Sequence, residues 1–157
     1  MDKRRILFVC LGNICRSPLG EGILRTMATK RGLESRVEAD SAGTGGWHHG
    51  EAPDRRSIDV GRENGVDISG LRARKIKPAD FSDFDMIFAM DRSNLRDLVK
   101  IAPHDSHADI HLFMDFVSGQ KRDVPDPYYG DRTDFEAVYQ MLSSGCEKLL
   151  ATLFRTA

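Results

Sequence analysis

The sequence contains few cysteines, no long apolar run and almost no net charge. Three cysteines among 157 residues do not make a disulfide framework, and the odd number argues further against one. We therefore expect a reducing compartment, the cytoplasm. No stretch approaches the roughly 20 apolar residues that a membrane-spanning helix needs. The net charge of −1 gives the chain no general affinity for nucleic acid or for an acidic membrane surface.

A targeting segment is not expected at the N-terminus. Basic residues at 3–5 precede the apolar run Ile6–Leu11, which loosely imitates a signal peptide. The run is shorter than an h-region of about 7–15 residues, and Gly12 ends it. The composition, 40% hydrophobic and 30% charged, is that of an ordinary soluble protein. We expect one domain covering residues 1–157.

Short apolar runs alternate with segments of helical periodicity. The runs at 6–9 and 86–89 are typical of strands buried on both faces, and shorter candidates occur at 37–39 and 110–112. Helices are expected at 17–32, 54–64, 91–101 and 133–154, the first with Ser17 as its N-cap residue. This alternation predicts an α/β fold with a single doubly wound parallel sheet. In such folds ligands bind at the carboxyl ends of the strands.

The segment Cys10–Ser17 joins the first expected strand to the first expected helix. A helix N-terminus presents unpaired N–H groups and positive partial charge, so this segment predicts an anion site. Gly12 and Asn13 can adopt positive φ, which lets successive N–H groups point inward. Arg16 adds a planar group suited to two phosphate oxygens. Cys10 would lie at the bottom, where positive surroundings favour a nucleophilic thiolate.

The spacing of Cys10 and Arg16 would be weak evidence alone. A single cysteine after a buried strand is usually a small core residue, and an arginine at a helix start is usually solvated. Their position between a buried strand and a Ser-Pro helix start, with Gly and Asn between them, favours function. Two nucleotide motifs are absent, G-x-x-x-x-G-K-[ST] and G-x-G-x-x-G after the first strand. A nucleotide or dinucleotide site is therefore not expected.

Four segments of the sequence resemble the low-molecular-weight protein tyrosine phosphatase family, and they occur in the family's order. The resemblance covers nearly the whole chain and is far more specific than the loop alone. The segments are Val9–Pro18, Asp40–Thr44, Ala89–Asp91 with Ser93–Leu95, and Val124–Gly130.

The resemblance implies a four-stranded parallel sheet flanked by helices, with a phosphate-binding loop after the first strand. It implies hydrolysis of phosphotyrosine and aryl phosphates through a phosphocysteine, without a metal or other cofactor. Partners would be phosphotyrosine-containing proteins, and phosphate or vanadate would inhibit. The protein would be a monomer, with at most weak dimers. The loop would comprise, besides Cys10 and Arg16, residues Leu11, Gly12, Asn13, Ile14, Cys15 and Ser17.

Asp126 is the expected general acid. A tyrosyl leaving group departs as a phenolate unless it is protonated, and a phenol has a pKa of about 10. A positioned acid contributes roughly 10²–10⁴-fold to such a step. Asp126 lies between Pro125 and Pro127, which restrict its backbone. Asp-Pro is also a common turn, and the resemblance to the family's acid loop decides between the two interpretations.

Aromatic residues are expected to form a deep slot for the substrate ring. The resemblance places Tyr128 and Tyr129 at one wall, and Trp47, the only tryptophan, could form the other. A deep slot would favour phosphotyrosine over the shorter phosphoserine. A tyrosine pair in a loop can also be simple surface. In the family the pair can itself be phosphorylated.

Several further residues are expected to support the site. Ser17 can donate a hydrogen bond to the Cys10 thiolate. By resemblance, Ser41 is the partner of Asn13, and Asp91 lies near the site. The resemblance also suggests a reversible disulfide between Cys15 and Cys10 that protects the nucleophile from over-oxidation. The family often has a histidine near Leu71, and this sequence has none.

Three alternatives fit less well. An arsenate reductase of similar fold would need further resolving cysteines, and none lies between Cys15 and Cys146. A non-catalytic phosphotyrosine-binding module would keep Arg16 but would need neither Cys10 nor Asp126. A metal site at the histidines lacks a Cys or Glu companion at metal-binding spacing. These histidines are His48, His49, His104, His107 and His111.

Overall fold

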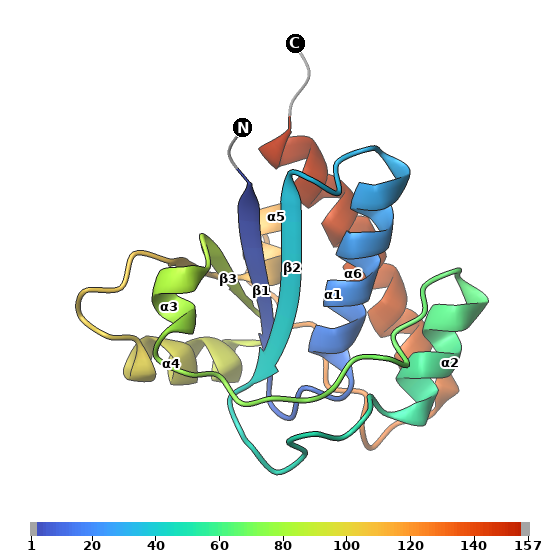
Figure 1. Cartoon of the computed structure of the whole chain (residues 1–157). Helices are drawn as coiled ribbons and strands as arrows, with labels where there is room; N and C mark the ends of the chain where they lie inside the picture. Colours follow the sequence, from blue (N-terminus) through green and yellow to red (C-terminus); the bar gives the residue numbers. More distant parts are fainter. Residues whose placement is uncertain (1–2, 155–157) are drawn as a thin grey trace.

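The computed structural model describes residues 3–154 and has one four-stranded parallel sheet with the order β2-β1-β3-β4 (Figure 1). The strands are β1 (Arg4–Cys10), β2 (Val37–Gly43), β3 (Met86–Ala89) and β4 (Asp109–Leu112). The helices are α1 (Arg16–Lys30), α2 (Arg55–Glu63), α3 (Asp80–Asp83), α4 (Arg92–Ile101), α5 (Phe113–Ser118) and α6 (Arg132–Leu153). The expected doubly wound α/β sheet is confirmed. None of the helices in residues 3–154 has the length and apolar character to cross a bilayer.

The two faces of β1 pack against different groups of helices. Ile6 and Phe8 belong to a buried cluster with side chains of α1, α5 and α6. Leu7 and Val9 point to the other face and pack with side chains of α3 and α4. All four side chains have no exposed surface, as expected for a continuous apolar strand in a parallel sheet. β1 is thereby fixed between two layers, and its carboxyl end carries Cys10.

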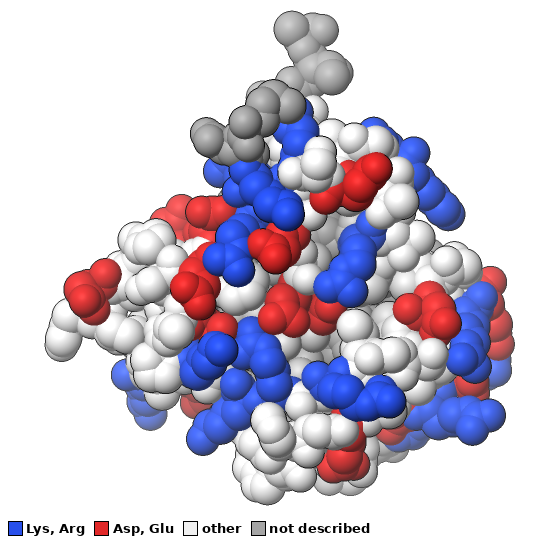
Figure 2. All heavy atoms as spheres, in the orientation of Figure 1, with Lys and Arg blue, Asp and Glu red and all other residues white. Residues whose placement is uncertain are grey.

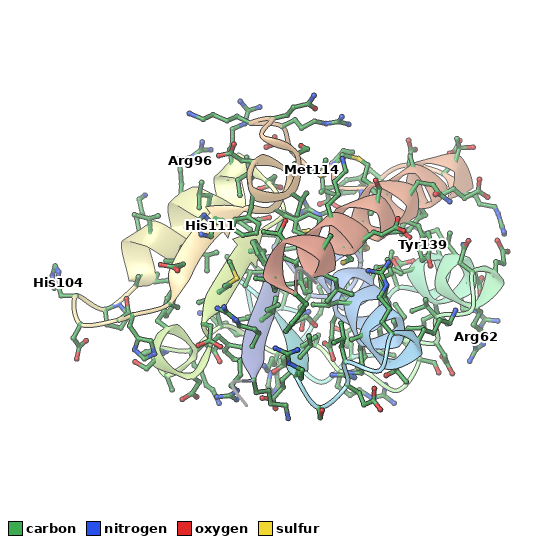
Figure 3. All side chains as sticks on the ribbon, turned by 90° about the horizontal axis from the view of Figure 1, so that it is seen from above. Arg62, Arg96, His104, His111, Met114 and Tyr139 are labelled. Atoms are coloured by element: carbon green, nitrogen blue, oxygen red, sulfur yellow. The ribbon has the colours of Figure 1, made fainter. Side chains whose placement is uncertain are left out.

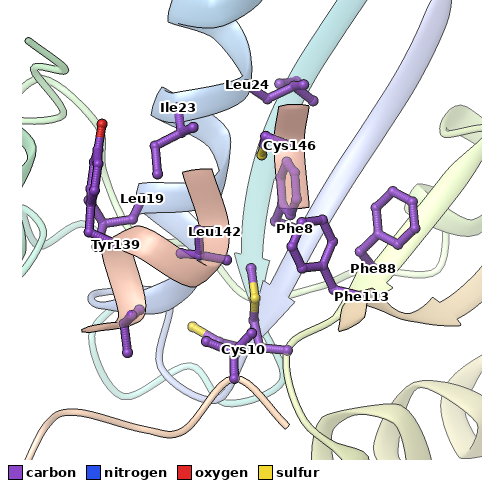
Figure 4. Close-up of a cluster of buried hydrophobic side chains, with 14 of the residues drawn as sticks. Phe8, Cys10, Leu19, Ile23, Leu24, Phe88, Phe113, Tyr139, Leu142 and Cys146 are labelled. Carbon is purple, nitrogen blue, oxygen red and sulfur yellow. The ribbon is translucent and has the colours of Figure 1, made fainter. Parts of the chain in front are cut away.

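Aromatic rings fill the cluster directly above Cys10 (Figure 4). The Phe8 and Phe113 rings pack edge to face with their centroids 5.7 Å apart, and the Phe8 and Phe88 ring centroids are 6.0 Å apart. Gly20 in α1 lets the helix approach closely, because a Cβ there would lie 3.0 Å from the Phe8 ring. This close packing fixes the end of β1 relative to the start of α1.

Element boundaries differ from the sequence expectations at two informative places. The helix α1 begins at Arg16, its N-cap residue is Cys15, and Ser17 lies inside the first turn. Ser17 is not the cap because its hydroxyl contacts the Cys10 sulfur instead. β2 extends beyond residue 39 because Asp40 and Ser41, although polar, pair with Leu7 and Phe8 of β1. The short helices α3 and α5 were not expected from the sequence.

Charged side chains on the face along β2 are mixed in sign (Figure 2). Arg5 pairs with Glu38 at 2.7 Å, and Arg74 pairs with Asp40 at 3.1 Å. The pairing of opposite charges along this edge matches the small net charge of −1.

The fully buried thiol of Cys146 predicts a pH-dependent stability. Burial raises the pKa of Cys146 above its ordinary value of 9.0, so the folded chain keeps a proton that the unfolded chain loses above that pH. This contribution is fully present below pH 9 and is lost as the pH rises. Between pH 9 and 10, we expect the free energy of unfolding of the wild type to fall by about 1 kcal/mol more than that of Cys146→Ala. Urea unfolding at pH 8, 9 and 10 measures this, and parallel curves would contradict it.

Candidate active site

The loop that joins β1 to α1 lies at the carboxyl edge of the sheet, at the bottom of Figure 1. Within residues 3–154, Asn13 is the only non-glycine residue with positive φ, at 58°. Gly12 does not have a positive φ. Position 12 favours glycine for a steric reason, because a Cβ there would lie 3.0 Å from the His48 ring. The loop therefore turns at Asn13, while Gly12 leaves room for a neighbouring side chain.

Cys10 is held at the base of this loop. Its side chain is buried, and its sulfur lies 3.0 Å from the Ser17 hydroxyl oxygen and 3.4 Å from the Ser17 backbone N. The hydroxyl and the N–H both lie where they can donate to a thiolate. Hydrogen bonds to an ionised sulfur favour the ionised form. The first turn of α1 can thus stabilise a nucleophilic sulfur at Cys10.

Arg16 connects three segments of the chain at the site. Nη1 donates to the Asp91 carboxylate at 2.6 Å and to the Val124 carbonyl at 3.0 Å. Nη2 lies 3.6 Å from the carboxylate of Asp126. Burial lowers the pKa of Arg16, but Cys10, Asp91 and Asp126 together raise it above its ordinary value. Nε is buried and has no partner among the described residues, so it is a donor that an anion can use.

Asp126 lies at the entrance, opposite the base of the loop. Its side chain is 41% exposed, and one carboxylate oxygen accepts a bond from the Tyr128 backbone N–H at 3.2 Å. The other oxygen is the one that lies near Arg16. A carboxyl group in this position can exchange protons with both solvent and a bound ester.

A cavity of about 210 Å³ contains the expected catalytic residues and the expected aromatic walls. Trp47 and Tyr129 are largely exposed at its mouth, and Tyr128 is partly covered. The sequence interpretation missed His48, whose ring also lines the cavity. Its position directly after Trp47 was the available signal. The lining residues are Cys10, Leu11, Gly12, Ile14, Cys15, Arg16, Trp47, His48, Asp126, Tyr128 and Tyr129.

The expected pair between Asn13 and Ser41 is wrong in this structure. The Asn13 amide donates to the Ser17 hydroxyl at 2.8 Å and accepts from the Arg74 backbone N–H at 2.9 Å. Ser41 instead donates to the buried Glu21 carboxylate at 2.7 Å. A buried carboxylate needs donors, and Ser41 supplies one. The backbone at Arg74 thus holds Asn13 in a chain that lacks a histidine near Leu71.

Asp91 contacts Arg16 and is also the N-cap residue of α4. One carboxylate oxygen accepts the Asn94 N–H at 2.7 Å, and the other accepts the Arg16 bond. The Asn94 side chain accepts in turn from the Asp91 N–H, which completes a capping box. The helix start therefore fixes the carboxylate that orients Arg16.

Arg56, at the start of α2, holds the segment that follows Asp126. Its guanidinium donates to the Tyr128 carbonyl at 3.0 Å and to the Gly130 carbonyl at 3.1 Å. It also stacks over the Phe135 ring, 4.4 Å from its centroid, and pairs with Asp54. Nothing in the sequence marked this arginine, because the two carbonyl groups that it holds lie more than seventy positions away.

The same turn of α2 also contacts the phosphate-loop segment. The Asp54 backbone N–H donates to the Ile14 carbonyl at 2.8 Å, and the Ser57 hydroxyl donates to the Cys15 carbonyl at 3.3 Å. The start of α2 therefore touches both the loop that carries Cys10 and the segment that follows Asp126.

The three cysteines are free in this structure. Cys15 is buried next to the site, and burial, followed by the nearby charges of Asp54, Cys10 and Asp126, raises the pKa of its thiol. Cys15 therefore keeps its proton near neutral pH and is a weaker nucleophile than a thiolate would be.

The histidines do not converge. His104 lies at the outer tip of the loop before β4, and His111 lies on β4 with its ring 4.9 Å from the Phe116 ring (Figure 3). Within residues 3–154, no three His, Cys, Asp or Glu side chains are grouped so that they could hold a metal ion.

Comparison with known proteins gives a consistent result over the whole chain. Residues 5–157 match the family model described as low molecular weight phosphotyrosine protein phosphatase. The low molecular weight protein-tyrosine-phosphatase YfkJ of Bacillus subtilis (strain 168) is 45% identical over 149 residues, with 94% of each chain covered.

Solved structures agree with this match. A protein tyrosine phosphatase from Entamoeba histolytica superposes with a TM-score of 0.90 at 37% identity, covering 96% of this chain and 97% of the other. A Drosophila arginine phosphatase superposes with a TM-score of 0.89 at 34% identity, covering 97% and 99%. Because the family model, the relative and the structures all extend over nearly the full chain, this chain belongs to the low molecular weight phosphotyrosine protein phosphatase family.

Proposed function

We propose that this protein-tyrosine phosphatase acts through a phosphocysteine formed on Cys10. The Cys10 thiolate attacks phosphorus, the bond between phosphorus and the phenolic oxygen breaks, and Asp126 donates its proton to that oxygen. A water molecule then attacks the phosphocysteine while Asp126 takes a proton from the water. The S–P bond breaks, the thiolate is restored and inorganic phosphate leaves.

The position of Arg16 is the observation that carries this proposal. It lies in one cavity with Cys10 and Asp126, and its guanidinium reaches 3.6 Å from the Asp126 carboxylate. Its free Nε and the loop N–H groups can bind the equatorial phosphate oxygens, whose charge grows in the transition state. Asp91 and the Val124 carbonyl hold the guanidinium in place. The Ser17 hydroxyl, 3.0 Å from the sulfur, stabilises the thiolate as it attacks and as it leaves.

The substrate class follows from the walls of the cavity. Trp47 and Tyr128 line the cavity that also contains Cys10 and Arg16, and aromatic side chains suit a phenyl ring. A phosphoserine side chain is too short to contact these walls while its phosphate occupies the loop. The partners would be phosphotyrosine-containing proteins. We also propose that the protein is a monomer, as the family resemblance implies. We propose a cytoplasmic location, which the three unpaired thiols support.

A panel of phosphate esters tests the substrate class. Turnover of p-nitrophenyl phosphate and phosphotyrosine is expected in the presence of a chelator, with inhibition by vanadate. Phosphoserine should react at least about 100-fold more slowly, because it forfeits the ring contacts. Phosphoarginine belongs in the panel because a Drosophila relative of the same fold is an arginine phosphatase. Faster turnover of phosphoarginine or phosphoserine than of phosphotyrosine would overturn the proposed substrate.

Cys15 gives a further regulatory proposal at this site. We propose that, once a peroxide has oxidised Cys10 to a sulfenic acid, the Cys15 thiol attacks the Cys10 sulfur. The sulfenic oxygen leaves as water with the Cys15 proton, and a disulfide forms. Supporting this, both cysteines line the same cavity. Reduction by an external thiol would then restore both cysteines.

A further inference from the structure

Large exposed apolar side chains are gathered around the mouth of the active site. Most exposed Leu, Ile, Phe and Trp residues of soluble proteins are scattered singly, and a gathered group marks a contact surface. Here five of the six in the described part of the chain line one of two neighbouring cavities. The six are Leu11, Trp47, Val99, Ile101, Tyr128 and Tyr129, and Val99 is the exception.

The second cavity adjoins the catalytic one and has a volume of about 230 Å³. Leu11 and Trp47 line both cavities, so they form the wall between the two. The far side of the second cavity is the end of α4. Its lining residues are Leu11, Thr44, Gly45, Trp47, Asp97, Lys100 and Ile101.

The floor of the second cavity is tied to the phosphate loop. The Thr44 N–H donates to the Cys10 carbonyl and the Gly45 N–H donates to the Leu11 carbonyl, both at 2.9 Å. The Trp47 ring lies directly on Gly45, where a Cβ would collide with it. The dividing wall is thus positioned by the same segment that positions Cys10.

The charges at the rim do not select an ion. Asp97 and Lys100 both line the cavity, one acidic and one basic, so their charges offset each other. Within residues 3–154 neither side chain forms an ion pair within 4.0 Å. The second cavity should therefore bind an apolar group, placed between Trp47 and Ile101, more strongly than a second phosphate group.

We propose that this second cavity binds an aliphatic side chain of the phosphoprotein substrate, from a residue that flanks the phosphotyrosine. Consecutive Cα atoms are 3.8 Å apart, so a flanking side chain can pass over Trp47 while the phosphotyrosine ring occupies the catalytic slot. The inference rests on the proposed phosphotyrosine activity. It adds a sequence preference that the slot alone does not provide.

Phosphotyrosine peptides with alanine at every flanking position, and versions with a single leucine at each position from −3 to +3, test this inference. At one or two positions leucine should raise kcat/KM about tenfold, the gain expected from burying such a side chain. Ile101→Ala should reduce that gain to about twofold or less. The matched control, Val99→Ala, removes a similar exposed side chain of α4 outside the cavity and should keep the full gain.

Turnover of p-nitrophenyl phosphate tests the phosphatase mechanism separately from the peptide subsite. It should be equal in the wild type, Ile101→Ala and Val99→Ala, because neither side chain lines the catalytic cavity. If the wild type hydrolyses this ester and free phosphotyrosine but leucine has no effect at any position, the second cavity is not a peptide subsite. An equal loss of the gain in both variants, or a dimer that Ile101→Ala dissociates, would also overturn the inference. An inactive wild type would overturn the phosphatase mechanism instead.

Discussion

Replacing Cys10 with serine is expected to abolish turnover while leaving phosphate binding intact. A serine hydroxyl is a much weaker nucleophile at neutral pH than a thiolate, so we expect kcat to fall by more than about 10³-fold. The phosphate site should survive, because Arg16 and the loop N–H groups hold it and the Ser17 contact does not require sulfur. Steady-state hydrolysis of p-nitrophenyl phosphate gives the loss, and calorimetric titration with phosphate gives the retained affinity.

A second cysteine provides the control for this experiment. Cys146→Ala removes a buried thiol in α6, outside the residues that line the catalytic cavity, and should keep the wild-type kcat. If Cys10→Ser retains activity, the phosphocysteine mechanism is wrong. If it loses phosphate binding together with activity, the serine has disrupted the loop and the comparison must be repeated with Cys10→Ala.

Asp126→Asn is expected to slow the first chemical step according to the leaving group. An asparagine cannot donate an acidic proton, so kcat/KM for phosphotyrosine should fall about 10²- to 10³-fold. Esters of more acidic phenols need less protonation and should lose much less. Plotting log kcat/KM against leaving-group pKa for a series of aryl phosphates should give a shallow slope for the wild type and a steep one for the variant.

Asp123→Asn is the matched control, because Asp123 lies on the same segment but pairs with Arg92 at 3.1 Å outside the cavity. Its slope should equal that of the wild type. A uniform loss across all leaving groups in Asp126→Asn would show a role in binding and not in proton transfer. An unchanged slope would assign the acid to another group.

Local sequence was sufficient for the central strands and for the loop that carries Cys10 and Arg16. Phe8 and its neighbours form an uninterrupted apolar run, which is typical of a strand buried on both faces. The loop after it carries Cys10 and Arg16 within seven positions. Asp126 was placed by its two flanking prolines together with the family resemblance. The structure brings it into the same cavity as Cys10.

The supporting contacts were beyond local sequence, because they join residues distant along the chain. The Ser41 hydroxyl donates to the Glu21 carboxylate, twenty positions away, and the Asn13 side chain accepts from the Arg74 backbone N–H. No residue near Asn13 in the sequence indicates that its partner is the Arg74 N–H and not the Ser41 hydroxyl. Helices as short as α3 and α5 bury too few residues to display a helical period.

The turn at the start of α2 that contains Arg56 also bears on the spacing between Asp126 and Cys10, the proposed acid and nucleophile. This single helical turn donates hydrogen bonds to the Ile14 carbonyl and to the Tyr128 and Gly130 carbonyls. The same turn therefore holds the loop that follows Cys10 and the segment that follows Asp126. We expect these bonds to keep the separation between the Cys10 sulfur and the Asp126 carboxylate unchanged when substrate binds. Substitutions in this turn should therefore alter proton transfer more than phosphate affinity, although none of its side chains lines the cavity.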